Sequence, residues 1–323
     1  MKTHPRDPAR VLPRALPPHL LTLGAVCFTV CAWASAFVSI RSAGAAYSPG
    51  ALALGRLLAA SLVLVTLLLL RREGLPPRGA RRGILLSGLV WFGGYTVALN
   101  WGERLVDAGT ASLLVNTGPI LMALLAARLL GEALPPRLLT GMAVSFAGAV
   151  VVGLSMSSGG DGSTPVLGVV LCLLAAVAYA TGVVAQKPAL SYGTPLQITT
   201  FSCLVGTVAC LPFAGQLAAE VPRAPLSATL NAVYLGVVPT ALAFTTWTYA
   251  LARMPAGKLG ATTYAVPAVV VLLSWILLGE VPAWLTLLGG LLCLAGVAVS
   301  RHRPRPRRTP ADAHARPPGG YEP

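Results

Sequence analysis

Long apolar stretches recur along the whole chain, and short polar segments separate them. Each stretch is close to twenty residues long, and a helix of that length, at about 1.5 Å per residue, crosses a hydrocarbon core about 30 Å thick. Strands of a membrane barrel would be about ten residues long and alternate in polarity, which these stretches do not. The pattern predicts an all-α integral membrane protein with ten transmembrane helices, over residues 20–40, 50–70, 83–101, 108–127, 138–154, 166–186, 196–213, 228–251, 258–278 and 284–300.

The composition agrees with a protein embedded in a membrane. Of the 323 residues, 55% are hydrophobic and only 11% are charged, whereas a soluble domain usually carries about 25% charged residues. The net charge of +14 comes mainly from the tails and short loops, so it does not indicate a surface for nucleic acid, and no nucleic-acid partner is expected. We expect disordered basic, Pro-rich tails at residues 1–19 and 301–323.

The positions of Lys and Arg predict the orientation in the membrane. If the N-terminus lies in the cytoplasm and the spans alternate, twenty of the 24 Lys and Arg residues fall in cytoplasmic segments, three fall outside, and Arg56 lies within a span. An excess of positive charge is typical of cytoplasmic loops. We therefore expect a multi-pass protein of the cytoplasmic membrane with both termini inside and an extracytoplasmic linker at residues 155–165.

One part of the sequence occurs twice, 148 residues apart. Residues 108–153 match residues 256–301 without a gap, and the matched positions include Pro119 with Pro267 and a Gly-Glu pair at the end of each span. Matches of Pro, Gly and Glu carry weight because Pro and Glu are costly inside apolar helices. The Gly-Glu pairs are expected to end their helices.

Each copy contains five predicted spans, which is an odd number. The second copy must therefore cross the membrane in the direction opposite to the first. Inverted repeats of this kind are common in secondary transporters, where the substrate site lies near the middle of the membrane between the repeats. The predicted five-helix repeats are residues 20–154 and 166–300.

Several short motifs occur in a fixed order in the first copy. They are Trp-Ala-Ser-x-Phe-Val-x-x-Arg (Trp33 to Arg41), Gly55-Arg56-Leu57-Leu58, Ala108-Gly109, Pro119, Gly131-Glu132, and Gly141 with Gly148. This ordered set, duplicated over about residues 20–300, resembles the drug/metabolite transporter (DMT) superfamily in its ten-span EamA-like branch. The resemblance implies two EamA-type domains that form a secondary carrier. Many such carriers export amino acids, other metabolites or drugs, and some are coupled to protons.

The resemblance also implies a substrate cavity among spans one, three and four and their counterparts six, eight and nine. Asn116 is expected to face protein or water rather than lipid, because an amide in hydrocarbon is costly. An interhelical hydrogen bond explains this residue as well as substrate contact does, and packing explains the aromatic residues as well as a site does. The polar and aromatic candidates for the cavity are Trp33, Tyr95, Asn116, Thr117, Tyr179, Thr240, Trp247 and Tyr264.

Three prolines inside the spans are candidates for bends or gates. Pro119, Pro239 and Pro267 each lack an N–H group and crowd the carbonyl group four residues back. Each is therefore expected to kink its helix near the middle of the membrane and to free one carbonyl oxygen there.

Arg56 is the charged side chain inside a span. It lies about a third of the way into the second span from the outside, where a charge is functional by default. It either binds an anionic group of the substrate or has a structural role, such as pairing with Glu103 or Asp107. Because the family has an arginine here despite varied substrates, a structural role is favoured.

Other kinds of chemistry are not indicated. The six cysteines lie in apolar stretches without CxxC spacing and the four histidines lie in the tails, so neither a metal site nor a cofactor is expected. No Asp or Glu lies in the middle of a span, so protons are a candidate coupling ion without a visible site. Small residues in spans five and ten suit internal packing or a homodimer face.

Two other functions compete with transport. One is a non-transporting membrane receptor or assembly protein, for which no motif argues. The other is a membrane-embedded enzyme that modifies lipids, which would need His, Asp or Glu clustered inside the membrane. The sequence therefore predicts a transporter and not an enzyme.

Overall fold

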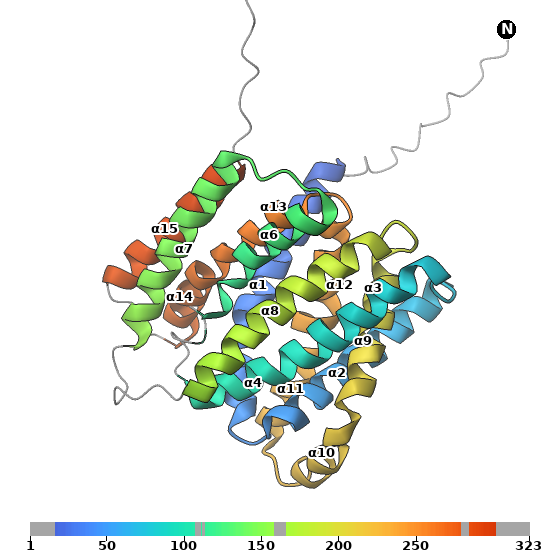
Figure 1. Ribbon diagram of the computed structural model, residues 1–323. Coiled ribbons are helices and arrows are strands. Elements are labelled where there is room, and N and C mark those ends of the chain that lie inside the picture. The colour runs from blue at the N-terminus through green and yellow to red at the C-terminus, as the bar shows by residue number, and fades with distance from the viewer. Residues whose placement is uncertain (1–16, 107–110, 112–113, 158–165, 279–283, 302–323) are drawn as a thin grey trace, which may run out of the picture.

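The computed structural model describes residues 17–106, 111, 114–157, 166–278 and 284–301, and every regular element in them is helical (Figure 1). The α-helices are α1 (Pro18–Gly44), α2 (Pro49–Leu70), α3 (Arg81–Leu86), α4 (Thr96–Leu105), α6 (Gly118–Leu130), α7 (Pro136–Ser157), α8 (Val166–Ala189), α9 (Pro195–Cys210), α10 (Ala214–Glu220), α11 (Leu226–Leu235), α12 (Ala243–Leu251), α13 (Ala256–Ala261), α14 (Ala265–Leu278) and α15 (Trp284–Arg301). Five short segments of tighter or wider helix join some of them: η1 (Arg78–Ala80), η2 (Ser87–Tyr95), η3 (Leu211–Phe213), η4 (Gly236–Leu242) and η5 (Thr262–Tyr264).

The described helices confirm an all-helical membrane fold. Six stretches are long and apolar enough to cross a membrane: Pro18–Ala36, Pro49–Leu70, Arg78–Leu105, Val166–Ala189, Pro195–Glu220 and Leu226–Leu251. The shorter apolar helices Gly118–Leu130, Pro136–Val151 and Leu287–Ser300, together with α14, bring the described spans to the predicted ten. Large apolar side chains face outward, such as Leu62 at 72% and Ile276 at 66% exposure, as a surface in contact with lipid requires.

The direction of each span gives the bundle two distinct ends. We name them the Pro18 end, where α1 begins, and the Gly44 end, where α1 finishes. The Pro18 end is uppermost in Figure 1, and α10 lies at the opposite end. The predicted tails and most of the predicted linker lie outside the described residues.

The third and eighth spans have the same unusual construction. Each contains a segment of π-helix in its middle, η2 in the third and η4 in the eighth. A shift of 148 residues places Gly88 of η2 on Gly236 of η4. A side chain at Gly88 would overlap the carbonyl oxygen of Ser202, and a side chain at Gly236 would overlap that of Arg56. Ser202 lies in span seven, 146 residues after Arg56 in span two. Span three therefore packs on span seven in the same way as span eight packs on span two.

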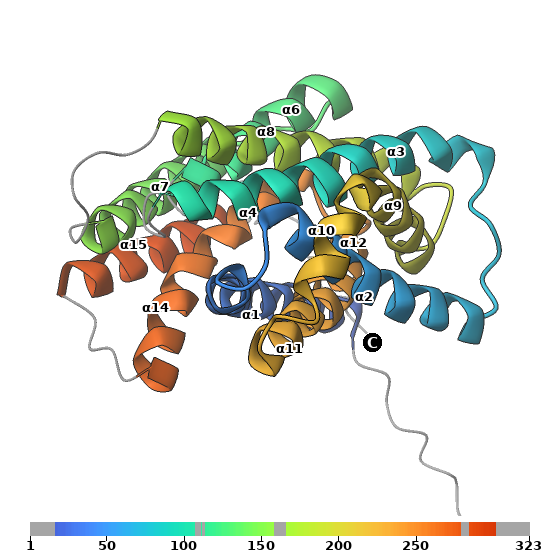
Figure 2. The same ribbon diagram turned by 90° about the horizontal axis from the view of Figure 1, so that it is seen from below.

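The fifth and tenth spans pack against each other through matched small residues. A Cβ atom at Gly141 would lie 2.6 Å from the carbonyl oxygen of Gly296, and one at Gly148 would lie 2.6 Å from that of Gly289. Because Gly289 and Gly296 are the counterparts of Gly141 and Gly148, the contact exchanges the two copies. α7 and α15 lie side by side in both views (Figures 1 and 2). These glycines therefore serve packing within the chain.

A pair of equivalent residues marks the centre of this contact. The Oγ atom of Ser145 donates a hydrogen bond to the carbonyl oxygen of Cys293 at 3.0 Å, and the Sγ atom of Cys293 donates to that of Ser145 at 3.5 Å. The two residues are 148 apart. Equivalent residues bond reciprocally only where a two-fold axis passes between them, so the described halves are related by an internal two-fold.

The first Gly-Glu pair ends its helix as expected. Gly131 follows α6 with a φ angle of +67°, the left-handed conformation that glycine adopts without strain. The second pair, Gly279 and Glu280, lies outside the described residues.

The close contact of α7 with α15 predicts a strong effect of bulk at Gly141. Gly141→Leu should lower the free energy of unfolding by about 1–3 kcal/mol or more, because the added side chain meets backbone atoms that cannot move aside. Thermal unfolding of the purified protein in detergent measures the change. Gly24→Leu is the matched control, since Gly24 also lies within a helix but has open space around it. Equal stability of the two variants would contradict this packing.

Candidate functional site

Two spans are interrupted at equivalent positions. In the fourth span, a turn at Asn116 and Thr117 precedes α6, which begins at Gly118. In the ninth span, α13 ends at Ala261, and a single turn of 3₁₀-helix that ends at Tyr264 precedes α14. A shift of 148 residues places Tyr264 on Asn116. Irregular backbone at membrane depth is tolerated only where it is buried in protein or lines a cavity, so both breaks point to a site.

Threonine hydroxyl groups donate hydrogen bonds to backbone carbonyl oxygens at the two breaks. The Oγ1 atom of Thr117 donates to the carbonyl oxygen of Leu114 at 2.7 Å. The Oγ1 atom of Thr263 donates to that of Gly260 at 2.8 Å, and Thr262 makes a similar bond. These short bonds keep the irregular backbone compatible with a membrane interior.

The prolines of the two breaks begin new helical segments. Pro119 lies in the first turn of α6, and Pro267 is the third residue of α14. A proline costs little in a first turn, because the N–H group that it lacks would have no partner there. Both prolines thus lie at the start of the helical segment that follows each break.

Pro239 lies within the π-helical segment of the eighth span. A proline at this position leaves the carbonyl oxygen of Leu235 without its usual donor. The Oγ1 atom of Thr240 donates to that oxygen at 2.8 Å. The Nε1 atom of Trp33 donates to the carbonyl oxygen of Pro239 at 3.1 Å. The distorted segment is therefore stabilised by side chains from its own span and from α1.

A cavity of about 80 Å³ lies between the two repeats. It is small beside the roughly 300–1,000 Å³ of typical ligand pockets. Ile40 and Leu99 line it, which places it in the half of the bundle toward the Gly44 end. The lining residues are Trp33, Ala36, Ile40, Arg56, Trp91, Tyr95, Leu99, Val115, Asn116, Pro119, Tyr179, Phe244, Thr263 and Val266.

Aromatic rings from both repeats form one side of the cavity. Trp33 lies 6.2 Å from Tyr179 and 5.6 Å from Phe244 between ring centroids, in edge-to-face geometry. Trp91 stacks on Phe244 at 4.6 Å. Trp33 and Tyr179 are counterparts under the 146-residue shift, so these two rings meet close to the internal two-fold. The wall is therefore built by both copies, with different rings from each.

Trp91 and Phe244 were missed by the reasoning from sequence. A signal was available for Trp91, which precedes Tyr95 by four residues and so shares its helix face. Phe244 offers a similar signal, because it follows Thr240 by four residues and precedes Trp247 by three, and both are sequence candidates.

The remaining sequence candidates do not line the described cavity. Trp247 is fully buried behind Trp33, with ring centroids 4.8 Å apart. Tyr264 is also fully buried, among residues of α7 and α15 such as Met142 and Cys293. The hydroxyl group of Thr117 donates a hydrogen bond to the backbone at the break in the fourth span, and that of Thr240 donates to the backbone next to η4. Ser112, which shares a face with Asn116 in a regular helix, lies outside the described residues.

Arg56 connects the second span to the eighth. Its side chain is only 4% exposed, and its Nε and Nη2 atoms donate to the Oγ1 atom of Thr240 at 3.2 and 2.9 Å. Neither bond goes to Glu103, and Asp107 lies outside the described residues. Glu103 nevertheless acts electrostatically on the guanidinium group, which lies on the cavity wall and is held there by the hydroxyl group of Thr240.

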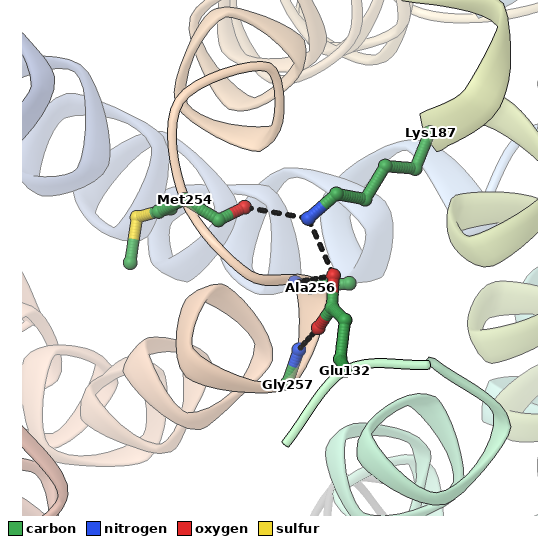
Figure 3. Close-up of polar contacts among 5 residues, drawn as sticks. All are labelled: Glu132, Lys187, Met254, Ala256 and Gly257. Atoms are coloured by element: carbon green, nitrogen blue, oxygen red, sulfur yellow. Dashed lines mark hydrogen bonds and ion pairs between the residues drawn. The ribbon is translucent and has the colours of Figure 1, made fainter. Parts of the chain in front are cut away.

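A polar network joins the two repeats at the Pro18 end (Figure 3). The Nζ atom of Lys187 lies 2.5 Å from Oε1 of Glu132 and donates to the carbonyl oxygen of Met254 at 2.8 Å. The carboxylate of Glu132 also accepts from the N–H groups of Ala256 and Gly257, at 2.9 and 3.3 Å. The ends of α6 and α8 and the start of α13 are therefore tied together on the side away from the cavity.

Comparison with known proteins decides the family. The profile of the EamA-like transporter family matches residues 20–154 and 166–301, one match for each half. The chain belongs to the EamA-like transporter family. It is therefore a multi-pass membrane transporter of the drug/metabolite transporter superfamily with a small-molecule substrate, and not an enzyme.

Two relatives and one solved structure extend this result. A "Probable terminal-alkyne amino-acid exporter" of Streptantibioticus cattleyicolor is 38% identical over 90% of this chain and 97% of that protein. The "Uncharacterized transporter YdfC" of Bacillus subtilis is 34% identical over 82% of this chain and 86% of that protein. A crystal structure with 24% identity has a TM-score of 0.71 and covers 88% of this chain and 96% of its own. That structure shows the shared fold.

The cavity geometry predicts which positions are reached from water. In a variant without the native cysteines, Asn116→Cys should react with a small charged methanethiosulfonate about tenfold faster than Tyr264→Cys. The two positions are equivalent in the repeats, but Asn116 lines the cavity and Tyr264 is enclosed by α7 and α15. Gel filtration checks that both variants are folded. Equal rates would show that the break in the fourth span does not face water.

Proposed function

We propose that this EamA-like transporter is a secondary carrier that exports small amphipathic metabolites, with amino acids as the first class to test. The observation that carries the proposal is the compact cavity between the repeats, whose wall is mostly aromatic and aliphatic with a few polar groups. Ligand sites usually have this composition. The probable amino-acid exporter of Streptantibioticus cattleyicolor, which aligns with almost the whole chain, supports amino acids ahead of drugs and other metabolites.

The arrangement of the two ends supports alternating access. The cavity lies toward the Gly44 end, and the network of Glu132 and Lys187 ties the opposite end closed. The loop charges favour placing the Pro18 end in the cytoplasm, which gives both termini a cytoplasmic location. In this orientation the described shape is closed to the cytoplasm. Loading from the cytoplasm then requires the network to separate.

The proposal leaves protons as the candidate coupling ion. None of the described residues that line the cavity is Asp, Glu or His, so no protonation site is assigned. An internal two-fold already makes a complete cavity within one chain, and a homodimer is therefore not needed for transport.

Transport itself is measured with the full chain in proteoliposomes. Preloaded radiolabelled amino acids should leave these vesicles at least about tenfold faster than vesicles without protein, and a pH gradient should change the rate if protons are coupled. Asn116→Ala should reduce the rate while leaving insertion intact. A panel of amino acids, sugars and cationic drugs without any flux would remove the proposal's support.

The network at the Pro18 end predicts a shift in accessibility. Glu132→Gln removes the ion pair with Lys187, so the Pro18 end should open more often. Asn116→Cys should then react about tenfold faster with a membrane-impermeant reagent applied from that side. Glu220→Gln is the matched control, because Glu220 accepts a hydrogen bond from the N–H group of Ser48 at the Gly44 end. An unchanged rate in Glu132→Gln would mean that the network does not close the cavity.

A further inference from the structure

The charge on the described cavity wall has one sign. Arg56 is the charged residue among the described residues that line it, and the others are aliphatic, aromatic or neutral polar. A cation that entered this cavity would meet a buried positive charge, and the carboxylate of Glu103, which acts electrostatically on Arg56, is not among the lining residues. The wall therefore favours a solute with a negative group.

Arg56 also has more hydrogen-bond donors than the protein uses. A guanidinium group carries five N–H donors in a planar fork. Two of them go to the Oγ1 atom of Thr240, and no other acceptor for them is found within the described part of the chain. The carboxylate of Glu103 also acts electrostatically on the guanidinium group. Within the described part of the chain, three of its donors thus remain for an acceptor that enters the cavity.

The hydroxyl group of Tyr179 is a second polar group on the cavity wall with unused hydrogen-bonding capacity. Tyr179 lines the cavity and is only 6% exposed. Its buried Oη atom makes no hydrogen bond of ordinary geometry among the described residues, although the side chain of Thr263 lies close to it. Buried hydroxyl groups are nearly always hydrogen-bonded, so this atom also indicates a polar group that the cavity is built to receive.

We infer that the cavity binds a carboxylate at Arg56, and that the apolar remainder of the substrate lies against the aromatic wall. The inference rests on the proposed function as a carrier and names its substrate class: monocarboxylates with an apolar side chain, α-amino acids among them. A carboxylate matches the guanidinium fork with two parallel hydrogen bonds. A single charge suits one arginine in a small apolar cavity better than a doubly charged phosphate does.

The aromatic wall accounts for the rest of an amino acid. The rings of Trp33, Trp91 and Phe244 offer apolar surface for a side chain. An aromatic face also accepts an ammonium group at a favourable energy. A cationic drug would meet the same aromatic face, but it has no carboxylate to bind Arg56 and its charge would be repelled by the guanidinium group. Cations without an acid group are therefore poor substrates.

The test uses the full chain in proteoliposomes and measures competition against efflux of labelled L-leucine and L-phenylalanine. Unlabelled competitors differ in one group: the two amino acids, their amides, phenethylamine, and 3-phenylpropionate. Compounds with the carboxylate should compete at concentrations about tenfold or more below those of the amides and the amine, which corresponds to about 1.4 kcal/mol or more. If the amides and the amine compete equally well, the inference is overturned while the carrier function stands. If neither labelled amino acid leaves these vesicles faster than it leaves vesicles without protein, the proposed function itself fails.

Variants separate substrate binding from a purely structural role of Arg56. In Arg56→Gln the preference for acid over amide should fall to about twofold or less, whereas a structural role would slow both in proportion. Arg56→Lys should keep part of the preference, because the charge stays and the planar fork is lost. Arg104→Gln, on the exposed part of α4, is the matched control and should keep the full preference. Should Arg56→Gln fail to fold, the competition series on the unaltered protein still decides, and a preference that persists in a folded Arg56→Gln overturns the inference.

Discussion

Every N–H and C=O group at membrane depth has to find its partner inside the chain, because lipid offers none. This constraint explains why the irregular parts of the fold are rich in threonine. The hydroxyl groups of Thr117 and Thr263 take carbonyl oxygens at the two broken spans. Thr240 takes the carbonyl oxygen that Pro239 leaves without a donor, and it accepts from Arg56 as well. Breaks, π-helical segments and cavity therefore depend on a small number of side-chain bonds, which allow the backbone to leave helical geometry without exposing polar groups to lipid.

The same constraint places the site where the repeats meet. An interrupted span is tolerated only where other helices surround it, and the spans that surround both breaks come from both halves of the chain. The close contacts of Gly88 and Gly236 bring spans three and eight against spans seven and two, with backbone touching backbone. The contact of α7 with α15 holds the outer part of the bundle in the same symmetric relation. Between these contacts lies the cavity, and the network of Glu132 and Lys187 joins the two repeats at the Pro18 end. The proposed alternating access depends on this symmetric packing and on the network at the Pro18 end.

The number and order of the spans, the duplication and the inversion all follow from the sequence, because apolar length and matched Pro and Gly residues are visible without a structure. The breaks in the fourth and ninth spans do not follow from the sequence in the same way. The residues before Pro119 and Pro267 include polar and small side chains that also occur in unbroken spans, so a continuous kinked helix fits the pattern as well as an interrupted one. Asn116 and Tyr264 are equivalent in sequence, yet one lines the cavity and the other is buried against α7 and α15, because the two copies meet different neighbours. The pairing of Glu132 with Lys187 joins residues 55 apart in the chain, and only the folded arrangement shows which distant charges come together.

The internal two-fold has a consequence for how a solute is oriented. A perfectly symmetric cavity would offer every ligand two equivalent poses, related by a half-turn about the axis. The two halves of this chain are free to differ, and they do so where it matters: Trp33 faces Tyr179, and the place that corresponds to Arg56 is held by Ser202. One pose brings a solute's negative end to the arginine, and the reversed pose brings it to an uncharged wall. Divergence of the copies thus removes this equivalence of the two poses, and with the carboxylate binding proposed for Arg56 a solute with two unlike ends would be held in a single direction.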